Sequence, residues 1–273
     1  MTAGILLLGA AYVLSQFFRA FLAVLTPVLG VDIGATPDDL ARASGLWFLA
    51  FAAMQIPIGW ALDTIGPRRT AGWVLLGGGG GGAAVFALAT APWHIDVAMT
   101  LIGVGCSPVL MASYYIFGRA YPPARFAVLA SLMLAIGSSG NLVAAYPMAF
   151  AAELIGWRAA LWGLAVLSTL VALGIFVCVT DPPKLEGEES GSLMGLFRLR
   201  ALWLIYPLIG VSYAISIGVR GLWIGPYLSD TFDATVSQIG TASLAMGIGM
   251  VVGALAYAKA DSLFPSRKWM IIG

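Results

Sequence analysis

The sequence predicts an all-α protein, a bundle of helices that crosses a membrane several times. Of the 273 residues, 60% are hydrophobic and only 10% are charged, whereas a soluble domain carries about 25% charged residues. The apolar residues are gathered into runs, and a helix needs about 20 such residues to cross a bilayer. Because lipid offers the backbone no hydrogen bonds, runs of this kind are expected to be helical.

Eight apolar runs are long enough to span, and a ninth begins at Trp269. The eight expected spans are residues 4–31, 40–62, 71–91, 95–117, 126–151, 157–180, 201–229 and 236–260. The first run follows Met1 without the basic segment that precedes a cleaved signal peptide, so we interpret it as a membrane span.

The longest polar stretch, residues 181–200, separates six spans from the rest and predicts a linker. We therefore expect three parts. They are an N-terminal six-helix bundle over residues 1–180, a linker over residues 181–200, and the beginning of a C-terminal bundle over residues 201–273.

Basic residues predict the orientation of the chain. Lys and Arg gather after the second, fourth and sixth spans, while the opposite loops carry mostly acids, such as Asp32, Glu153 and Asp230. The positive-inside rule then places the N-terminus and the linker in the cytoplasm. We expect a multi-pass protein of the cytoplasmic (in bacteria, inner) membrane.

Two pairs of short segments resemble each other. Residues 63–69 and 261–267 share an Asp, a Pro and a final Arg at the same spacing, and residues 35–40 resemble residues 234–239. The seventh and eighth spans are therefore predicted to repeat the first and second. Internal repeats of this kind are typical of transporters.

Several other classes of site are disfavoured by the composition. We find no grouping of nucleophile, histidine and acid, and the single histidine, His94, argues against a His-rich metal site. The glycine run 77–82 lacks the Gly-Lys-Ser/Thr of a phosphate-binding loop, so we interpret it as a place where helices pack closely. We expect no enzyme, no cofactor, no metal and no nucleic-acid partner.

Two arginines lie inside predicted spans, Arg19 in the first and Arg220 in the seventh. A charge at membrane depth costs about 3 kcal/mol or more, so it is expected to face a cavity or a partner. The guanidinium group matches carboxylate, phosphate or sulfonate. The repeat places the two arginines within about one helical turn of equivalent positions. We predict a site for a small anion, and a structural ion pair is the alternative.

Other polar and aromatic residues at membrane depth are candidates for lining the same site. Tyr12 and Gln16 share a helical face with Arg19, and Tyr213 and Trp223 share one with Arg220. Each could instead make a hydrogen bond or a packing contact between helices. The predicted substrate-binding residues are Arg19, Arg220, Tyr12, Gln16, Gln55, Tyr114, Asn141, Tyr213 and Trp223.

The segment from Gly59 to Thr70, with the sequence GWALDTIGPRRT, lies between the second and third spans. It resembles the cytoplasmic loop motif of the major facilitator superfamily, and residues 118–126 and 156–158 resemble other loops of that family. The resemblance implies that the loop latches a cytoplasmic gate. The gating residues carried over are Gly59, Asp63, Gly66, Arg68 and Arg69.

The resemblance also implies a function. Members of that family carry solutes by alternating access between two six-helix halves, and the paired arginines resemble those of its organic-anion and phosphate-ester carriers. We expect a secondary transporter of a small organic or inorganic anion, monomeric in the bilayer and lacking the last spans of the family plan. Two alternatives stay open: proton-coupled multidrug efflux, and a carrier-like sensor that does not transport.

Overall fold

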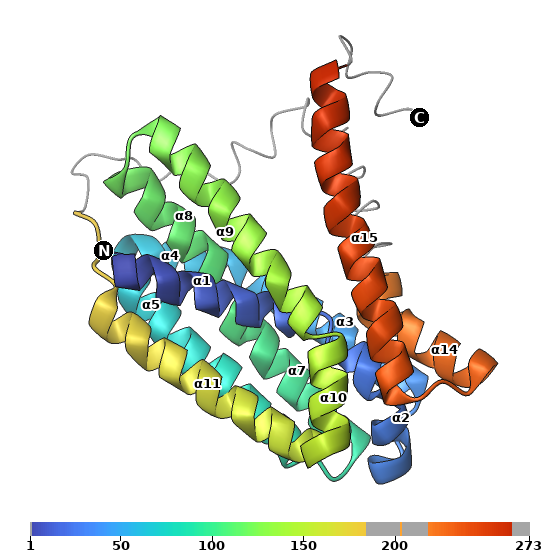
Figure 1. Cartoon of the computed structure of the whole chain (residues 1–273). Helices are drawn as coiled ribbons and strands as arrows, with labels where there is room; N and C mark the ends of the chain where they lie inside the picture. Colours follow the sequence, from blue (N-terminus) through green and yellow to red (C-terminus); the bar gives the residue numbers. More distant parts are fainter. Residues whose placement is uncertain (1, 184–202, 204–217, 264–273) are drawn as a thin grey trace.

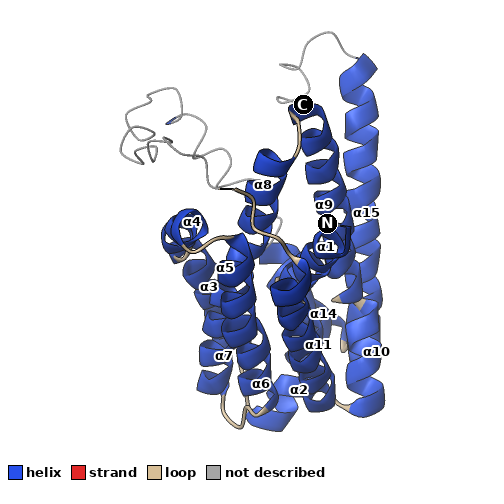
Figure 2. Cartoon of the chain, turned by 90° about the vertical axis from the view of Figure 1, so that its left-hand side faces the viewer, coloured by secondary structure: helices blue, strands red, loops and turns tan. Residues whose placement is uncertain are grey.

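The computed structural model describes residues 2–183, 203 and 218–263, which form helices and loops without any strand (Figures 1 and 2). The elements, in chain order, are α1 (Thr2–Phe17), α2 (Leu22–Ile33), α3 (Pro37–Ala53), α4 (Gln55–Thr64), α5 (Pro67–Val74), η1 (Leu75–Gly80), α6 (Gly81–Ala87), α7 (Pro92–Cys106), α8 (Pro108–Ala120), α9 (Pro123–Val143), α10 (Tyr146–Ile155), α11 (Trp157–Cys178), η2 (Val219–Trp223), α14 (Ile224–Phe232) and α15 (Val236–Leu263).

The predicted all-α membrane bundle is confirmed. Five helices in the described residues are long and apolar enough to cross a membrane, or six if the bent pair α1 and α2 counts as one span. Four of these helices start at a proline that precedes the apolar run: Pro37, Pro67, Pro92 and Pro123. Proline suits the first helical position because the backbone N–H that it lacks would have no partner there.

The first span is broken, which the sequence did not indicate. α1 and α2 meet at an angle of 53°, and residues 18–21 between them form turns. Further along, Pro27 lies inside α2, where it has no backbone N–H to donate to the carbonyl group of Ala23. The Thr26 hydroxyl donates to this Ala23 oxygen at 3.0 Å, so the freed carbonyl keeps a partner in the apolar surroundings.

The turn that ends this span recurs at the end of α14. Gly34 and Asp233 both adopt the left-handed conformation, with φ of 68° and 51°. In each turn the next residue donates its N–H to the carbonyl six residues earlier, at 3.2 Å in both cases. Asp233 is the one described non-glycine residue with positive φ. The same local geometry supports the repeat predicted from the sequence.

The helices that follow these turns start in the same way. At α3 the Thr36 hydroxyl accepts the N–H of Asp39, and the Asp39 carboxylate accepts the N–H of Thr36. At α15 the pair is Thr235 and Gln238, with the Gln238 side-chain oxygen 2.8 Å from the Thr235 nitrogen. Both are capping boxes, which satisfy two backbone donors reciprocally.

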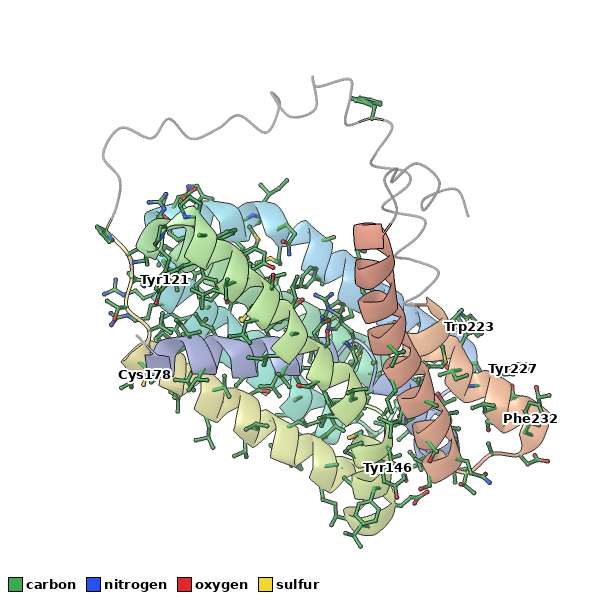
Figure 3. All side chains as sticks on the ribbon, turned by 45° about the horizontal axis from the view of Figure 1, so that its top comes forward. Tyr121, Tyr146, Cys178, Trp223, Tyr227 and Phe232 are labelled. Atoms are coloured by element: carbon green, nitrogen blue, oxygen red, sulfur yellow. The ribbon has the colours of Figure 1, made fainter. Side chains whose placement is uncertain are left out.

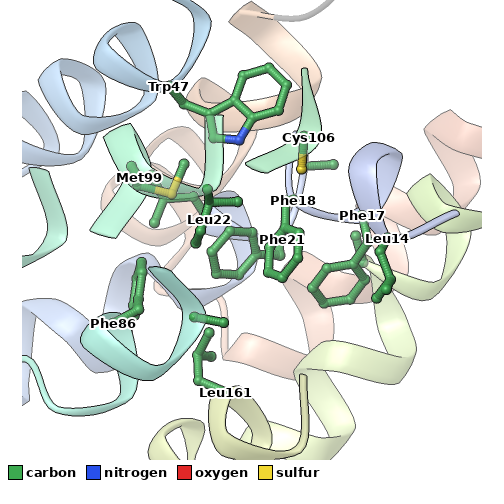
Figure 4. Close-up of a cluster of buried hydrophobic side chains, with 14 of the residues drawn as sticks. Leu14, Phe17, Phe18, Phe21, Leu22, Trp47, Phe86, Met99, Cys106 and Leu161 are labelled. Carbon is green, nitrogen blue, oxygen red and sulfur yellow. The ribbon is translucent and has the colours of Figure 1, made fainter. Parts of the chain in front are cut away.

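Residues 2–183 form the first segment of the described chain and residues 218–263 the second. Glycines bring the helices of the first segment into close contact. An added Cβ at Gly103 would lie 2.4 Å from the Trp47 carbonyl oxygen, which seats α7 against α3. The predicted close packing at the glycine run is also found, since a Cβ at Gly78 would lie 2.4 Å from the Gly105 nitrogen. Figure 4 shows the core that results, where Phe18, Phe21 and Leu22 from the broken span meet Trp47 and residues of α6, α7 and α11.

The bundle has two ends. The Asp63 end holds Asp63, the α8–α9 connection and Asp181, and the Asp32 end holds Asp32, the α6–α7 connection and Gly156. Residues 218–263 meet the first segment through α14 on α2 and through α15 on α10. α15 starts beside α10 and diverges from α9 toward the Asp63 end (Figure 1). Residues 184–200 of the expected linker lie outside the described residues, so the domain boundaries stay a prediction.

Candidate functional site

Arg19 lies at the break between α1 and α2, half-buried in the bundle. Its guanidinium carbon is 4.8 Å from the centre of the Phe51 ring and 5.2 Å from the centre of the Trp47 ring. Both rings belong to α3. Cation–π contacts of this kind are worth about 0.5–2 kcal/mol, more where water is excluded, so the rings offset part of the cost of holding the charge here.

The two rings are themselves a stacked pair. Trp47 and Phe51 lie one helical turn apart on α3, with ring centres 5.2 Å apart and ring planes at 11°. Trp47 is 1% exposed, and its indole nitrogen has no hydrogen-bond partner in the structure. Neither residue is among the predicted substrate-binding residues, because an aromatic pair at helical spacing is also the pattern of ordinary core packing.

Two residues of the predicted polar stripe, Tyr12 and Gln16, lie on α1, whereas Arg19 lies beyond the end of this helix in the turns at residues 18–21. The Gln16 amide donates to the Tyr12 hydroxyl at 3.1 Å. The Tyr12 ring packs against α9, where a Cβ on Gly137 would lie 2.1 Å from a ring carbon. Tyr12 and Gln16 therefore lie on the segment that leads into Arg19, and Tyr12 is fixed there by a neighbouring helix.

Three other candidates sit on separate helices. Gln55, at the start of α4, donates to the backbone oxygen of Phe51 at 3.0 Å, which joins it to the aromatic pair. Tyr114 of α8 packs edge-on to Phe126, with ring centres 5.9 Å apart. Asn141 of α9 buries its side-chain oxygen without a hydrogen-bond partner. An unsatisfied buried acceptor is costly, which makes Asn141 the strongest of the three candidates.

The candidates from the seventh span are placed only in part. Tyr213 lies outside the described residues. The backbone of Arg220 belongs to η2, which contacts α2 and α3, the helices next to Arg19; its side chain is not described. Trp223 is 49% exposed and lies with Tyr227 on the outer side of this segment (Figure 3), beside a groove of about 450 Å³. The pairing of Arg19 with Arg220 stays a prediction.

Ser243 on α15 was not among the predicted site residues. Its hydroxyl is buried, with the residue 8% exposed, and has no hydrogen-bond partner. It lies between Gly240 and Gly247, whose added Cβ atoms would lie 2.6 Å from Ala149 and 2.9 Å from Leu142. The spacing of these three small residues on one helical face is the signal that could have identified this contact surface.

The loop motif at the Asp63 end forms two ionic contacts. The Asp63 carboxylate is 3.9 Å from the guanidinium group of Arg119. The guanidinium carbon of Arg119 lies 4.2 Å from the centre of the Tyr115 ring. Gly59 faces Met111 of α8, with 3.8 Å between its added Cβ and the methyl carbon. Asp63 and Gly59 thus connect α4 to α8, while Arg69 is exposed.

Asp181, which is not among the residues predicted for the motif, contacts the second half of the motif. Its carboxylate accepts the backbone N–H of Arg68 at 2.7 Å and lies 3.9 Å from the Arg68 side chain. Gly66, the residue before α5, has a φ of 102°, and a Cβ on it would lie 3.1 Å from the carboxyl group of Asp181. Asp181 therefore caps α5 from the far end of α11, and only glycine fits between them.

The Asp32 end is tied by a second set of contacts. The Asp32 carboxylate accepts from the Arg158 side chain and, at 2.9 Å, from the Trp157 indole. Arg158 also donates to the Ala89 backbone oxygen at 3.0 Å. An apolar groove of about 660 Å³ lies beside this pair, lined by residues of α2, α10 and α11, and Arg19 is not part of its lining. In the described part of the chain, no group of three or more metal-binding side chains occurs.

Comparison with known proteins gives a family and a fold. Residues 8–273 match the family model described as Major Facilitator Superfamily. A protein of Escherichia coli (strain K12), described as "Probable L-galactonate transporter", is 22% identical over 270 residues, covering 88% of this chain and 56% of its own length. The chain thus spans about half the length of this curated relative.

Solved transporters share the fold. A bacterial homologue of the human lysosomal transporter Spinster, in an inward-facing and unoccupied conformation, superimposes with a TM-score of 0.68 at 16% identity, covering 96% of this chain and 63% of that one. A D-xylose–proton symporter gives 0.68 at 13% identity, with 96% and 69% covered. The nucleoside transporter NupG gives 0.66 at 14% identity, with 96% and 68% covered.

Proposed function

The chain belongs to the Major Facilitator Superfamily, and on that premise we propose that it carries a small organic anion of the sugar-acid type across a membrane. Arg19 holds the carboxylate of the solute from the first segment, and Arg220 approaches it from the second. The observation that carries the proposal is the placement of Arg19, a permanent cation half-buried at a helix break.

The surroundings of Arg19 suit an anion. Phe51 and Trp47 contact the Arg19 guanidinium group through cation–π interactions, and a guanidinium group carries a planar fork of N–H donors in addition to its π face. Those donors match a carboxylate in a bidentate geometry. The two rings thus help to position a group whose charge and geometry suit an anion.

Two further observations favour a sugar acid over a simple inorganic anion. The relative from Escherichia coli is described as a probable L-galactonate transporter, and galactonate carries one carboxylate and several hydroxyl groups. On α1, the helix that leads into Arg19, Tyr12 and Gln16 supply a hydroxyl and an amide, and on α9 Asn141 offers a buried oxygen without a partner. Such groups recognise hydroxyl groups of a solute.

The arrangement of the two segments supports alternating access. α15 contacts α10 at the Asp32 end and diverges from α9 toward the Asp63 end (Figure 1). The positive-inside rule assigns the Asp63 end, with Arg68, Arg69 and Arg119, to the cytoplasm. In this proposal the structure represents the state that is closed to the outside. The motif from Gly59 to Arg69 stabilises the opposite state, which is closed to the cytoplasm.

The test is uptake of labelled galactonate by the 273-residue chain in proteoliposomes. We expect saturable uptake that excess unlabelled galactonate inhibits and that neutral galactose does not. Arg19→Ala should abolish it, while Arg125→Ala, which removes an exposed arginine at the start of α9, should leave it unchanged. Equal inhibition by galactose, or uptake by Arg19→Ala equal to the parent, would overturn the proposal.

A further inference from the structure

The first turn of α15 lacks an acidic residue. At the start of any helix the first backbone N–H groups have no partner within the helix, and the helix dipole makes this end positive. Thr235 and Gln238 satisfy two of these donors through the capping box. The N–H of Ser237, one residue before Gln238, is not served by that box.

A carboxylate from the other segment serves it. The Glu153 side chain, near the end of α10, accepts the Ser237 N–H at 2.8 Å across 84 residues of sequence. The equivalent helix of the first segment, α3, has acidic residues in its own first turn, Asp38 and Asp39. α15 thus takes from α10 the negative charge that α3 supplies for itself.

This hydrogen bond lies beside close contacts between the two segments. A Cβ on Gly240 would lie 2.6 Å from Ala149, which brings α15 against α10. A Cβ on Gly225 would lie 2.1 Å from the Ala23 oxygen, which brings α14 against α2. Two turns further along the same face of α15, a Cβ on Gly247 would lie 2.9 Å from Leu142 of α9, and beyond this contact α15 diverges from α9 (Figure 1). The Glu153 contact is therefore at the closed end of the pair of segments.

We propose that Glu153 is a latch that holds the Asp32 end closed by capping α15 from the opposite segment. The proposal rests on alternating access, because opening of this end separates α15 from α10 and breaks the hydrogen bond between Glu153 and Ser237. Glu153 is exposed to solvent, so water replaces the bond readily once the helices part. The latch then biases the equilibrium between the two states without making either inaccessible.

Spin-label distances in the 273-residue chain in lipid nanodiscs test the latch without any transport. Labels at Leu154→Cys on α10 and Phe232→Cys on α14, both exposed positions, report the separation of the segments in a background with Cys106 and Cys178 replaced by alanine. Glu153→Ala should raise the ratio of the long-distance to the short-distance population by about threefold to tenfold, the range expected for a helix cap at a dipole. Glu153→Gln keeps an acceptor and should show a smaller shift.

The donor is tested separately. Ser237→Pro removes the backbone N–H at a position in the first turn where proline is tolerated, and it should give a shift like that of Glu153→Ala. The double variant should shift no further than either single one, because both remove the same bond. Ser237→Ala, which keeps the N–H, and Asp38→Ala, which removes an acid elsewhere at the same end, should resemble the parent.

Parent-like distances in both Glu153→Ala and Ser237→Pro would overturn the latch, and so would shifts that simply add in the double variant. The labels report closure without any solute. A failure here would therefore leave the binding role of Arg19 untouched, and a failure of galactonate uptake would leave the latch standing.

Discussion

The guanidinium group of Arg19 lies 4.8 Å from the ring centre of Phe51, at the point where the first span is broken. The break and the contact belong together. In a continuous helix, the position of residue 19 along the helix would fix the direction of its side chain. The turns at residues 18–21 instead allow the axes of α1 and α2 to differ in direction by 53°. The guanidinium group of Arg19 therefore lies against the aromatic pair of α3 inside the bundle.

The contact between Arg19 and Phe51 predicts an energetic coupling. In a double-mutant cycle, Arg19→Met and Phe51→Leu should show a coupling of about 0.5–1 kcal/mol in the free energy of unfolding in micelles. The control is Phe48→Leu, which removes an aromatic ring from the same helix. Phe48 packs edge-on to Trp47, with ring centres 4.8 Å apart. If Phe48 couples to Arg19 as strongly as Phe51 does, the contact is not specific.

The cap that Asp181 forms on α5 predicts a graded loss of stability. Asp181→Ala removes the acceptor of the Arg68 N–H and should lower the free energy of unfolding by about 1–2 kcal/mol. Asp181→Asn keeps an acceptor but loses the charge, so it should cost less. The ion pair at 3.9 Å is partly exposed and adds little. Chemical denaturation of the two variants at low and high salt checks this order, and equal losses would contradict it.

Close packing of α1 on α9 predicts that two glycines on different helices respond oppositely to alanine. A Cβ on Gly140 would lie 2.1 Å from the Val13 oxygen, whereas one on Gly163 of α11 would meet nothing within 4 Å. Gly140→Ala should destabilise the protein by about 1–3 kcal/mol through overpacking. Gly163→Ala should be neutral or stabilise it by up to about 1 kcal/mol. Thermal unfolding of both variants decides, and a Gly140→Ala protein as stable as the parent would contradict the packing.

Much of the fold could be predicted because it depends on local composition. Apolar runs of spanning length gave six spans that the structure contains, and the repeat of residues 35–40 at 234–239 matches capping boxes at Thr36 and Thr235. The helix ends were predicted less well, since helices such as α3 and α5 start at prolines outside the apolar runs. Apolarity reports the depth of the membrane core, whereas helix ends follow backbone hydrogen bonding.

The site could be predicted only in its charged and polar members. Arg19 and Gln16 stand out because polar groups are rare and costly at membrane depth. Trp47 and Phe51 do not, because aromatic residues occur throughout an apolar chain. Asp181 and Glu153 act through contacts with helices distant in sequence, at Arg68 and Ser237, and no local pattern marks the partner of such a contact.

The central claim is that Arg19 binds the carboxylate of the solute, and equilibrium binding of labelled galactonate to the purified 273-residue chain tests it most directly. The parent and Arg125→Ala should bind with the same affinity, and galactose should not compete. Arg19→Lys should bind more weakly, and Arg19→Ala should lose at least about tenfold in affinity, as expected when a charge-assisted bidentate contact is removed. Unchanged galactonate affinity in a folded Arg19→Ala protein would contradict the account.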